Sequence, residues 1–339
     1  MTALPVLPTM GVGSYASPGW LIVGRQKIRD NTLGPADIDE LLEDATRIAI
    51  ADQVEAGLDI ISDGELRRQR FVYEMYDRLA GLTRVPPRRR VGVPGYDMAP
   101  HFRAEEPITA PKGLGVVGEF RQLKVLAPDR PLKVTLPGPL TFAGAIDEGA
   151  RTREQILEDL IRLVHTEMMA LASAGATFLQ LDEPSFPAPP YGMSLDDAVA
   201  IINRTIAQVP GQVAVHVCFG NNAGRPTRDR RMGRLFPAIE RLDCKQLLME
   251  FANREMAEIE LMAGLARKFQ IFCGVVDVKS FYRETPEDVA RRIDECLKHV
   301  PADRLGVTAD CGFSALPRFL AREKLRALVA GAKLVRGRL

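Results

Sequence analysis

Short apolar segments alternate with longer amphipathic segments along this chain. The apolar segments are rich in valine, isoleucine and leucine, and they have the length of buried strands. They cover residues 5–14, 58–65, 132–139, 177–184, 212–219, 246–252, 271–278 and 305–312. The sequence therefore predicts eight strands.

The segments between these strands have the three- to four-residue spacing of apolar side chains that is typical of amphipathic helices. The clearest examples cover residues 37–57, 152–174 and 287–298. Pro35 and Pro286 stand near two helix starts, and Gly57 and Gly175 stand at two helix ends, as is usual at helix boundaries. Eight strands that alternate with helices predict an α/β fold and favour a (β/α)8 barrel.

Polar residues recur at the carboxyl end of one predicted strand after another. They are Ser14, Glu65, Asp182 with Glu183, His216 with Cys218, Glu250, Asp277 and Cys311. In a barrel these ends converge on one face, where active sites lie. An open doubly wound sheet is the alternative, but GVGSYASPG, which overlaps the end of the first strand, lacks the G-x-G-x-x-G spacing of a phosphate loop.

The whole chain, residues 1–339, is expected to form one barrel domain. Residues 67–111 are rich in arginine, proline and glycine, and they do not continue the strand–helix alternation. We therefore expect them to form an insertion after the second strand, near the face on which the polar residues converge.

Composition excludes several classes of partner. The 45 basic and 44 acidic residues leave a net charge of +1, which gives no electrostatic reason to bind nucleic acid or an anionic membrane. No segment approaches the roughly 20 apolar residues that a membrane-spanning helix needs, and the N-terminus does not resemble a signal peptide. Five cysteines without a disulfide framework indicate reduced thiols, so we expect a cytoplasmic location.

His216 and Cys218 stand two residues apart in the run AVHVCFG. Residues at this spacing in a strand point to the same side, so the pair could form half of a zinc site. Glu250 and Cys311, each at the end of another apolar strand, are the candidates for the other half. The spacing alone leaves a second interpretation open, in which His216 is a hydrogen-bonded core residue and the cysteines are small buried side chains.

Seven motifs resemble those of one enzyme family in order and spacing. They are SDGELRRQR, TLPGPLTF, LQLDEPSF, HVCF, LLMEF, GVVDVKS and TADCGFS. Together they resemble the C-terminal catalytic domain of cobalamin-independent methionine synthase, from LPTMGVGS to about residue 330. The resemblance implies a zinc-bearing (β/α)8 barrel that transfers a methyl group to homocysteine. It also implies that the Zn²⁺ ligands are His216, Cys218, Glu250 and Cys311.

The resemblance further assigns the residues that bind the amino-acid part of homocysteine. Glu65 and Asp182 match positions that hold the ammonium group, and two carboxylates are suitable partners for one cation. Ser14 matches the position that binds the carboxylate. The alternatives are that Glu65 forms a salt bridge with an arginine that follows it, and that Asp182 caps the next segment. Strand alternation turns Glu183 away from Asp182, which favours a structural role for Glu183.

The sequence departs from the family at the methyl donor. The family motif D-x-H-S, whose histidine suits proton transfer, is here Asp277-Val278-Lys279-Ser280. Strand alternation places Lys279 on the side of Asp277, so the two are the candidate catalytic pair, and an ion pair between them is the alternative. The folate-binding N-terminal barrel and the tryptophan segment that stacks on pterin have no counterpart, the latter sought at residues 92–102. We therefore expect methylcobalamin or a corrinoid protein as donor, not a folate polyglutamate.

Two other functions stay open. The chain could resemble epoxyalkane:coenzyme M transferases, in which a thiolate opens an epoxide, although the sulfonate of coenzyme M would need cations where Glu65 and Asp182 stand. It could also be a non-catalytic barrel that zinc stabilises and that binds a corrinoid protein. A closed metal site would favour the latter function, because a catalytic zinc keeps a position for substrate.

Overall fold

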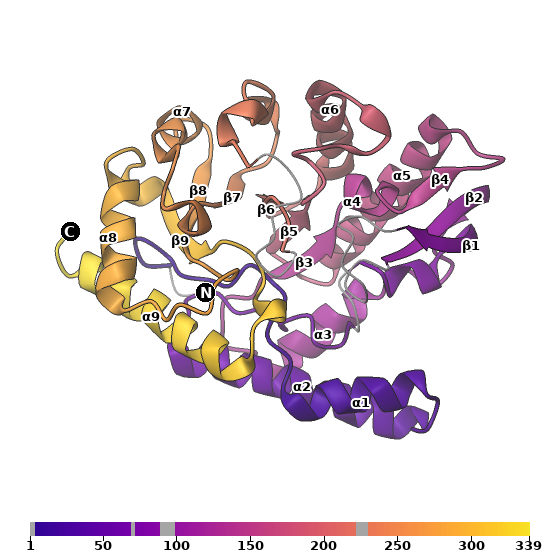
Figure 1. Cartoon of the computed structure of the whole chain (residues 1–339), viewed down its shortest axis with the longest axis horizontal. Helices are drawn as coiled ribbons and strands as arrows, with labels where there is room; N and C mark the ends of the chain where they lie inside the picture. Colours follow the sequence, from indigo (N-terminus) through magenta and orange to yellow (C-terminus); the bar gives the residue numbers. More distant parts are fainter. Residues whose placement is uncertain (1–3, 69–71, 89–98, 222–229) are drawn as a thin grey trace.

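The computed structural model describes residues 4–68, 72–88, 99–221 and 230–339. Its centre is a six-stranded parallel sheet in the order β3-β5-β6-β7-β8-β9. The strands are β3 (Val134–Pro137), β5 (Phe178–Asp182), β6 (Gln212–Val217), β7 (Gln246–Glu250), β8 (Gln270–Val276) and β9 (Leu305–Ala309). Figure 1 shows how they succeed one another around the molecule.

Two short segments close this sheet into a barrel. Thr9 forms a parallel bridge with Val307 of β9, and Met10 forms one with Ile60. A third bridge then joins the second segment to the chain just before β3, at Leu132. The predicted (β/α)8 barrel is therefore confirmed, but its first two strands are reduced to isolated bridges.

Their shortness has a local cause. The first predicted strand contains Pro5 and Pro8, which have no N–H group to donate to a neighbouring strand. The second predicted strand runs into a turn, where Gly64 has a φ of +72° and Glu65 a φ of +56°. Prolines in one segment and a left-handed turn in the other leave little extended backbone for pairing.

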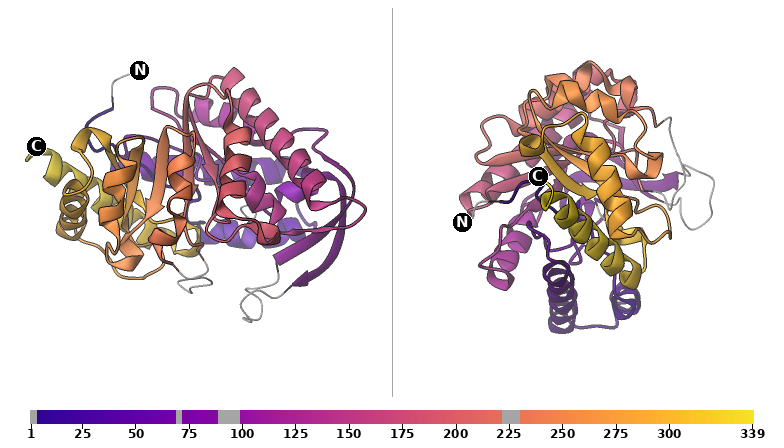
Figure 2. Two further views of the ribbon diagram at one scale, coloured as in Figure 1. Left: turned by 90° about the horizontal axis from the view of Figure 1, so that it is seen from above. Right: turned by 90° about the vertical axis from the view of Figure 1, so that its left-hand side faces the viewer.

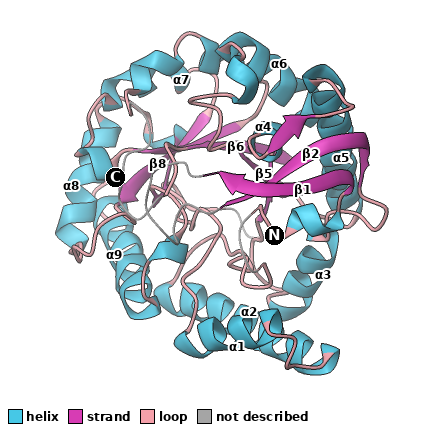
Figure 3. Ribbon diagram, turned by 45° about the vertical axis from the view of Figure 1, so that its right-hand side comes forward, coloured by secondary structure: helices cyan, strands magenta, loops and turns pink. Residues whose placement is uncertain are grey.

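The helices surround the sheet (Figure 3). They are α1 (Gly19–Arg29), α2 (Pro35–Ala56), α3 (Val116–Leu126), α4 (Pro139–Ala143), α5 (Arg153–Ser173), α6 (Leu195–Ile206), α7 (Met262–Leu265), α8 (Pro286–Leu297) and α9 (Arg318–Arg336). The three predicted helices correspond to α2, α5 and α8. Thr152 and Thr285 begin two of them with capping boxes. None of the described helices has the length and apolar character that crossing a bilayer requires.

Residues between the second barrel segment and α3 form a separate hairpin. Its strands β1 (Ala80–Arg88) and β2 (Ala99–Thr109) are antiparallel, and β2 also pairs in parallel with β4 (Ile146–Glu148). This three-stranded sheet lies to one side of the barrel in Figure 2 (left). Most of the segment compared with the pterin-stacking region, residues 92–98, lies outside the described residues.

A second apolar cluster is separate from the main core, and its side chains come only from barrel strand positions. The cluster consists of Met10, Ile60, Phe178, Ala214, Leu248 and Phe272. Since the outward faces of the strands pack against helices, we assign this cluster to the barrel interior. Phe272 fits closely there, because a Cβ atom placed on Gly306 of the neighbouring strand would lie 2.3 Å from its ring.

Phe272→Ala is expected to lower the free energy of unfolding in urea by about 3–5 kcal/mol, because the rigid interior cannot close the cavity that it leaves. Phe281→Ala is the matched control, since Phe281 is 69% exposed and its truncation should cost less than about 0.5 kcal/mol. Equal losses in the two variants would show that the cluster does not contribute to the stability of the barrel.

Candidate metal and substrate site

Three possible metal ligands meet at the carboxyl ends of the strands. The ligand atoms of His216 in β6, Cys218 just after it and Cys311 just after β9 all lie within 4.8 Å of one another. The two sulfur atoms are 3.7 Å apart. Two Zn–S bonds of about 2.3 Å at the tetrahedral angle would place the sulfurs about 3.8 Å apart, so the thiols are spaced to share one metal ion.

The ring of His216 is oriented for the same purpose. Its Nδ1 lies 2.9 Å from Oδ1 of Asp182, its strand partner in β5, so that Nδ1–H donates to the carboxylate. Nε2 is buried, and no described residue pairs with it. A carboxylate on one ring nitrogen is the usual partner of a metal-binding histidine, whose other nitrogen faces the metal. Burial alone would lower the pKa of His216, but the Asp182 carboxylate outweighs it and raises that pKa.

Glu250, the fourth predicted ligand, lies at the end of β7 and is completely buried. Its Oε2 accepts hydrogen bonds from Phe219 N at 3.2 Å and from Lys279 Nζ at 2.5 Å. Its Oε1 has no hydrogen-bond partner in the described part of the chain. The structure thus brings three of the four predicted ligands into one cluster, and the fourth has a carboxylate oxygen that a metal could use.

Lys279 does not point as strand alternation predicts. Strand β8 ends at Val276, and the backbone N–H of Lys279 donates to Oδ1 of Asp277 at 2.7 Å in the turn that follows. The Lys279 ammonium pairs with Glu250, and the Asp277 carboxylate accepts from Asn253 Nδ2. The alternative of an ion pair between Lys279 and Asp277 was therefore wrong. Burial lowers the pKa of Lys279, but the nearby negative charges, chiefly the Glu250 carboxylate, outweigh burial and raise that pKa above its ordinary value. Lys279 therefore stays protonated at neutral pH.

The two thiols differ in acidity in the metal-free protein. The hydrogen bond from Cys218 lowers the pKa of Cys311 to about 7, against the opposing effect of burial, and the positive charges at His216 and Lys279 act in the same direction. The same hydrogen bond raises the pKa of Cys218. One of the two sulfurs is therefore easily ionised at neutral pH, as a metal ligand must be.

Glu65 lies in the turn after the second barrel segment and is 5% exposed. Its Oε1 accepts from Thr135 Oγ1 at 2.6 Å, and its Oε2 is 3.5 Å from the Arg68 guanidinium. The predicted alternative of a salt bridge is thus present, although this distance is longer than a hydrogen bond. Burial raises the pKa of Glu65 to about 7, against the effect of Arg68. Gly13 must lack a side chain here, because a Cβ would lie 2.3 Å from Glu65 Oε1.

Asp182 and Ser14 complete the predicted substrate residues. Among the described residues, both hydrogen bonds to the Asp182 carboxylate end on Oδ1, so Oδ2 is left for a ligand. The Asp182 charge is close enough to contribute to the raised pKa of Glu65, after the larger effects of burial and Arg68. Ser14 is half-buried, and its Oγ packs against Gly312, the residue after Cys311. Asp182 and Ser14 therefore lie next to the thiol cluster, and Glu65 lies near Asp182.

Glu183 has the structural role that strand alternation favours. Its buried carboxylate accepts hydrogen bonds from Leu140 N at 3.0 Å, from Thr141 N at 2.9 Å and from Thr141 Oγ1 at 2.7 Å. It thereby satisfies free N–H groups in the first turn of α4. Burial raises the pKa of Glu183 to about 8, and these hydrogen bonds oppose the shift.

Several buried polar residues near the site were not predicted. Lys133, just before β3, is 1% exposed, and Gln180 in β5 is completely buried. Burial lowers the pKa of Lys133 to about 7, although the charges of Asp182 and Glu65 oppose the shift. A lysine inside the apolar run LKVTLPGP was the signal that could have identified Lys133.

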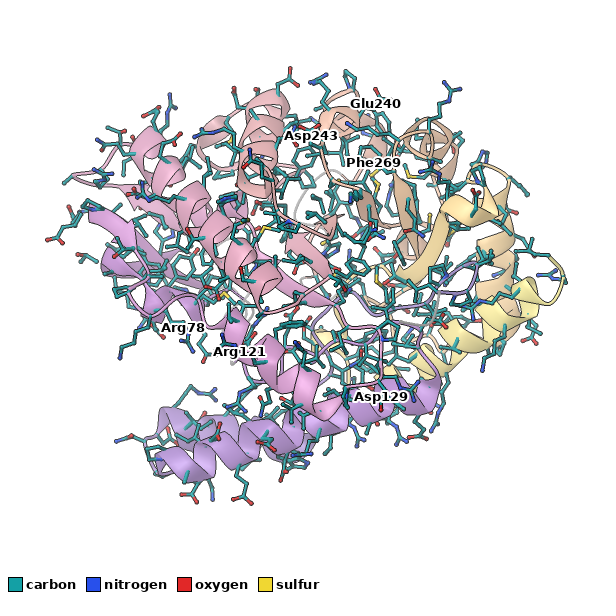
Figure 4. All side chains as sticks on the ribbon, turned by 180° about the vertical axis from the view of Figure 1, so that it is seen from behind. Arg78, Arg121, Asp129, Glu240, Asp243 and Phe269 are labelled. Atoms are coloured by element: carbon teal, nitrogen blue, oxygen red, sulfur yellow. The ribbon has the colours of Figure 1, made fainter. Side chains whose placement is uncertain are left out.

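Arg68 links the site to a cleft on the outside of the barrel. The cleft has a volume of about 880 Å³ and is lined by residues of α2, α3 and α5 and of the connection that leads from the second barrel segment to α3. Arg78 and Arg121, labelled in Figure 4, line it together with Arg68. The buried Arg68 guanidinium donates to Glu119 Oε2, which lines the cleft, and to Thr135 O, and it also approaches Glu65. The cleft itself contains none of the cysteines.

The fold and the site define a barrel with two thiols and a histidine clustered at the carboxyl ends of its strands, in an arrangement that could hold a metal ion. A family model described as the catalytic domain of cobalamin-independent synthase matches residues 7–334. The chain therefore belongs to the cobalamin-independent methionine synthase family.

Individual relatives are similar over almost their whole length. A methionine synthase from Sulfurisphaera tokodaii is 30% identical over 337 residues, which cover 99% of this chain and 94% of the relative. One from Thermococcus kodakarensis is also 30% identical, with 98% and 94% coverage. A solved B12-independent methionine synthase from Shewanella sp. W3-18-1, in complex with selenomethionine, has a TM-score of 0.84 and 27% identity over 98% of this chain and 99% of that one.

Lys279→Met is expected to destabilise the metal-free protein by about 3–5 kcal/mol, because it leaves the buried Glu250 carboxylate without its ion pair. Urea unfolding after removal of metal measures this loss. Lys298→Met is the control, since Lys298 pairs with Glu295 on the exposed surface of α8 and should cost less than about 1 kcal/mol. A Lys279→Met variant as stable as the control would mean that the Lys279–Glu250 pair is not maintained in solution.

Proposed function

We propose that this protein is a zinc-dependent methyltransferase that converts homocysteine to methionine. The main support for the proposal is the pair of thiols 3.7 Å apart beside Nε2 of His216, which has no hydrogen-bond partner among the described residues. Family membership and the methionine synthases among the relatives support the same reaction.

Zinc fits the donor set better than a harder cation does. Two thiolates and an imidazole are ligands that Zn²⁺ prefers, whereas Mg²⁺ and Ca²⁺ prefer oxygen. We assign the ligands as His216, Cys218, Glu250 and Cys311. Bound zinc would supply a thiolate form of the substrate at neutral pH, which is the nucleophilic form of a thiol.

Glu65, Asp182 and Ser14 are the proposed residues for the amino-acid part of homocysteine. Oδ2 of Asp182 and the Glu65 carboxylate would accept hydrogen bonds from the ammonium group, and Ser14 would bind the carboxylate. The selenomethionine in the Shewanella relative supports an amino-acid pocket of this kind, because selenomethionine is the selenium analogue of the proposed product.

Lys279 and Asp277, which the sequence predicts as the catalytic pair, are proposed as positioning residues, with roles adapted to the geometry. The raised pKa of Lys279 makes it a poor proton donor at neutral pH, so we infer that its charge fixes the Glu250 carboxylate. Asp277 orients Lys279 by accepting its backbone N–H. A proton-transfer role, as predicted from the family histidine, is less compatible with this arrangement.

Methylcobalamin or a corrinoid protein is the proposed donor and would act as a substrate, not as a resident cofactor. In the transfer, the homocysteine sulfur forms a bond to the methyl carbon. The cobalt–carbon bond breaks, and its electron pair stays on cobalt.

The purified protein is expected to bind about one Zn²⁺ per chain, and its zinc X-ray absorption spectrum should gain a sulfur ligand when homocysteine is added. A gain with coenzyme M alone would favour the epoxide-opening function. No gain with either thiol would favour a closed structural site and would contradict the proposal.

Variants of two cysteines test which thiol binds the zinc. Cys311→Ala should weaken zinc binding more than about 100-fold and abolish methionine formation from methylcobalamin. Cys244→Ala is the control, because Cys244 is a buried cysteine just before β7 that does not belong to the thiol cluster. Competition with a chromophoric chelator measures both affinities.

Glu65→Gln is expected to raise the KM for homocysteine about 10-fold or more, because it removes a charged partner of the ammonium group. The kcat/KM for 3-mercaptopropionate, a thiol acid without an ammonium group, should change little. In the unmodified enzyme the KM for homocysteine should rise as the pH falls below about 7, where Glu65 becomes protonated. Glu158→Gln, on the surface of α5, is the control, and a KM effect of Glu65→Gln no larger than that of Glu158→Gln would argue against the assignment.

A further inference from the structure

A chain of buried hydrogen bonds begins beneath the site at Lys133. The ammonium group of this lysine donates to the carbonyl oxygens of Gly11 at 2.6 Å and Val12 at 2.7 Å, and to Oε1 of Gln180 at 2.7 Å. An ammonium group has three protons, so these bonds use its whole donor capacity. The three bonds of the protonated form therefore hold the lysine nitrogen in one position inside the barrel.

Gln180 continues the chain toward the site. Its Nε2 donates to Val12 O at 2.8 Å and to Oδ1 of Asp182 at 2.7 Å, while its Oε1 accepts from Lys133. The reversed amide would place its NH₂ group against the Lys133 ammonium and its oxygen against the Asp182 carboxylate. Only one orientation of the amide therefore satisfies its neighbours.

Asp182 is the point at which the chain reaches both parts of the site. Its Oδ1 accepts from Gln180 and from Nδ1 of His216. Two donors on the same oxygen fix the plane of the carboxylate and the tilt of the imidazole ring together. Oδ2 of Asp182 and Nε2 of His216, which accept or donate no hydrogen bond within the described part of the chain, are thereby held at a fixed position relative to one another.

The same chain also holds the segment that carries Ser14. Val12 O accepts hydrogen bonds from both Lys133 and Gln180. The next residue, Gly13, packs directly against Glu65. Lys133 and Gln180 are thus linked to three of the proposed substrate residues and to one proposed metal ligand.

We propose that Lys133 and Gln180 are positioning residues, which align Asp182 and the first loop so that the metal-binding nitrogen of His216 and the substrate-binding carboxylate face the same point. Neither residue touches substrate or metal. The substrate part of this inference rests on the proposed function, whereas the His216 part depends only on the metal site.

Gln180→Leu tests the inference. It should raise the KM for homocysteine and weaken zinc binding, each by about 10- to 100-fold, which is typical of losing a residue that orients a metal ligand. The visible absorption spectrum of the cobalt-substituted protein should also change, because a tilted His216 ring alters the ligand field. Lys133→Met should change KM, zinc affinity and spectrum in the same direction.

Gln246→Leu is the matched control. Gln246 is a buried glutamine in β7, whose Nε2 donates to Gln270 Oε1 at 2.7 Å without a link to the site. It should lose stability as Gln180→Leu does, but retain the KM, the zinc affinity and the cobalt spectrum of the unmodified protein. This comparison separates positioning from a merely structural role.

Gln180→Glu provides a second variant if Gln180→Leu does not fold. It retains the volume and the bond from Lys133 but places an acceptor against Asp182, so it should change the same three quantities. The inference is overturned if the Gln180 variants that fold have a KM and a zinc affinity within about twofold of those of Gln246→Leu, together with the same cobalt spectrum. Failure of the proposed function is distinguishable, because the unmodified protein would then form no methionine while zinc affinity and the cobalt spectrum still report on His216.

Discussion

The compensation of buried charge is the constraint on which this structure depends. A charged group taken out of water is costly unless a partner of opposite charge or several hydrogen bonds replace the solvent. At the carboxyl ends of the strands, Lys279 compensates Glu250 and Arg68 approaches Glu65. Lys133 is compensated by two backbone carbonyls and Gln180. The barrel can therefore hold several ionisable side chains in its interior, each with a partner of opposite charge or with hydrogen bonds.

The compensation of buried polar groups is incomplete at two side chains of the site. Nε2 of His216 and Oε1 of Glu250 are buried without a partner among the described residues, while every other hydrogen-bonding atom of these two side chains is engaged. Unpaired buried atoms are uncommon in folded proteins, and each one needs an explanation. His216 Nε2 lies with two adjacent thiols in one cluster that could hold a metal ion, and such an ion would replace the missing bond.

The barrel and most of its site could be predicted from the sequence, because both depend on the periodic spacing of apolar and polar residues. Strand–helix alternation predicted the fold, and the side-chain alternation of β6 placed His216 with Cys218. Where the backbone leaves a regular element, this reasoning fails. Lys279 lies beyond the end of β8, so a turn and a long flexible side chain decide where its ammonium points. No strand rule could have directed it to Glu250.

The three-stranded sheet β1-β2-β4 and the hydrogen-bond chain of Lys133 and Gln180 were not predicted from the sequence, for different reasons. The strands β1 and β2 contain prolines and charged residues, and β4 has only three residues, so none shows the apolar pattern of a buried strand. Lys133 and Gln180 lie within apolar runs that were correctly assigned to strands. Their role depends on which strands become neighbours, and this information appears only once the barrel is closed.

Closure of the barrel also affects the order in which the protein can mature during synthesis. The first barrel segment pairs with β9, nearly 300 residues later, through Thr9 and Val307. Cys311 follows directly, so a nascent chain that still lacks β9 has one thiol of the pair and an open seam beside its first strand. Domains emerge from the ribosome at about 5–20 residues per second, so this incomplete state persists for seconds. A metal ion at the proposed site would therefore enter late, as one of the last events of folding, when the two ends of the barrel meet.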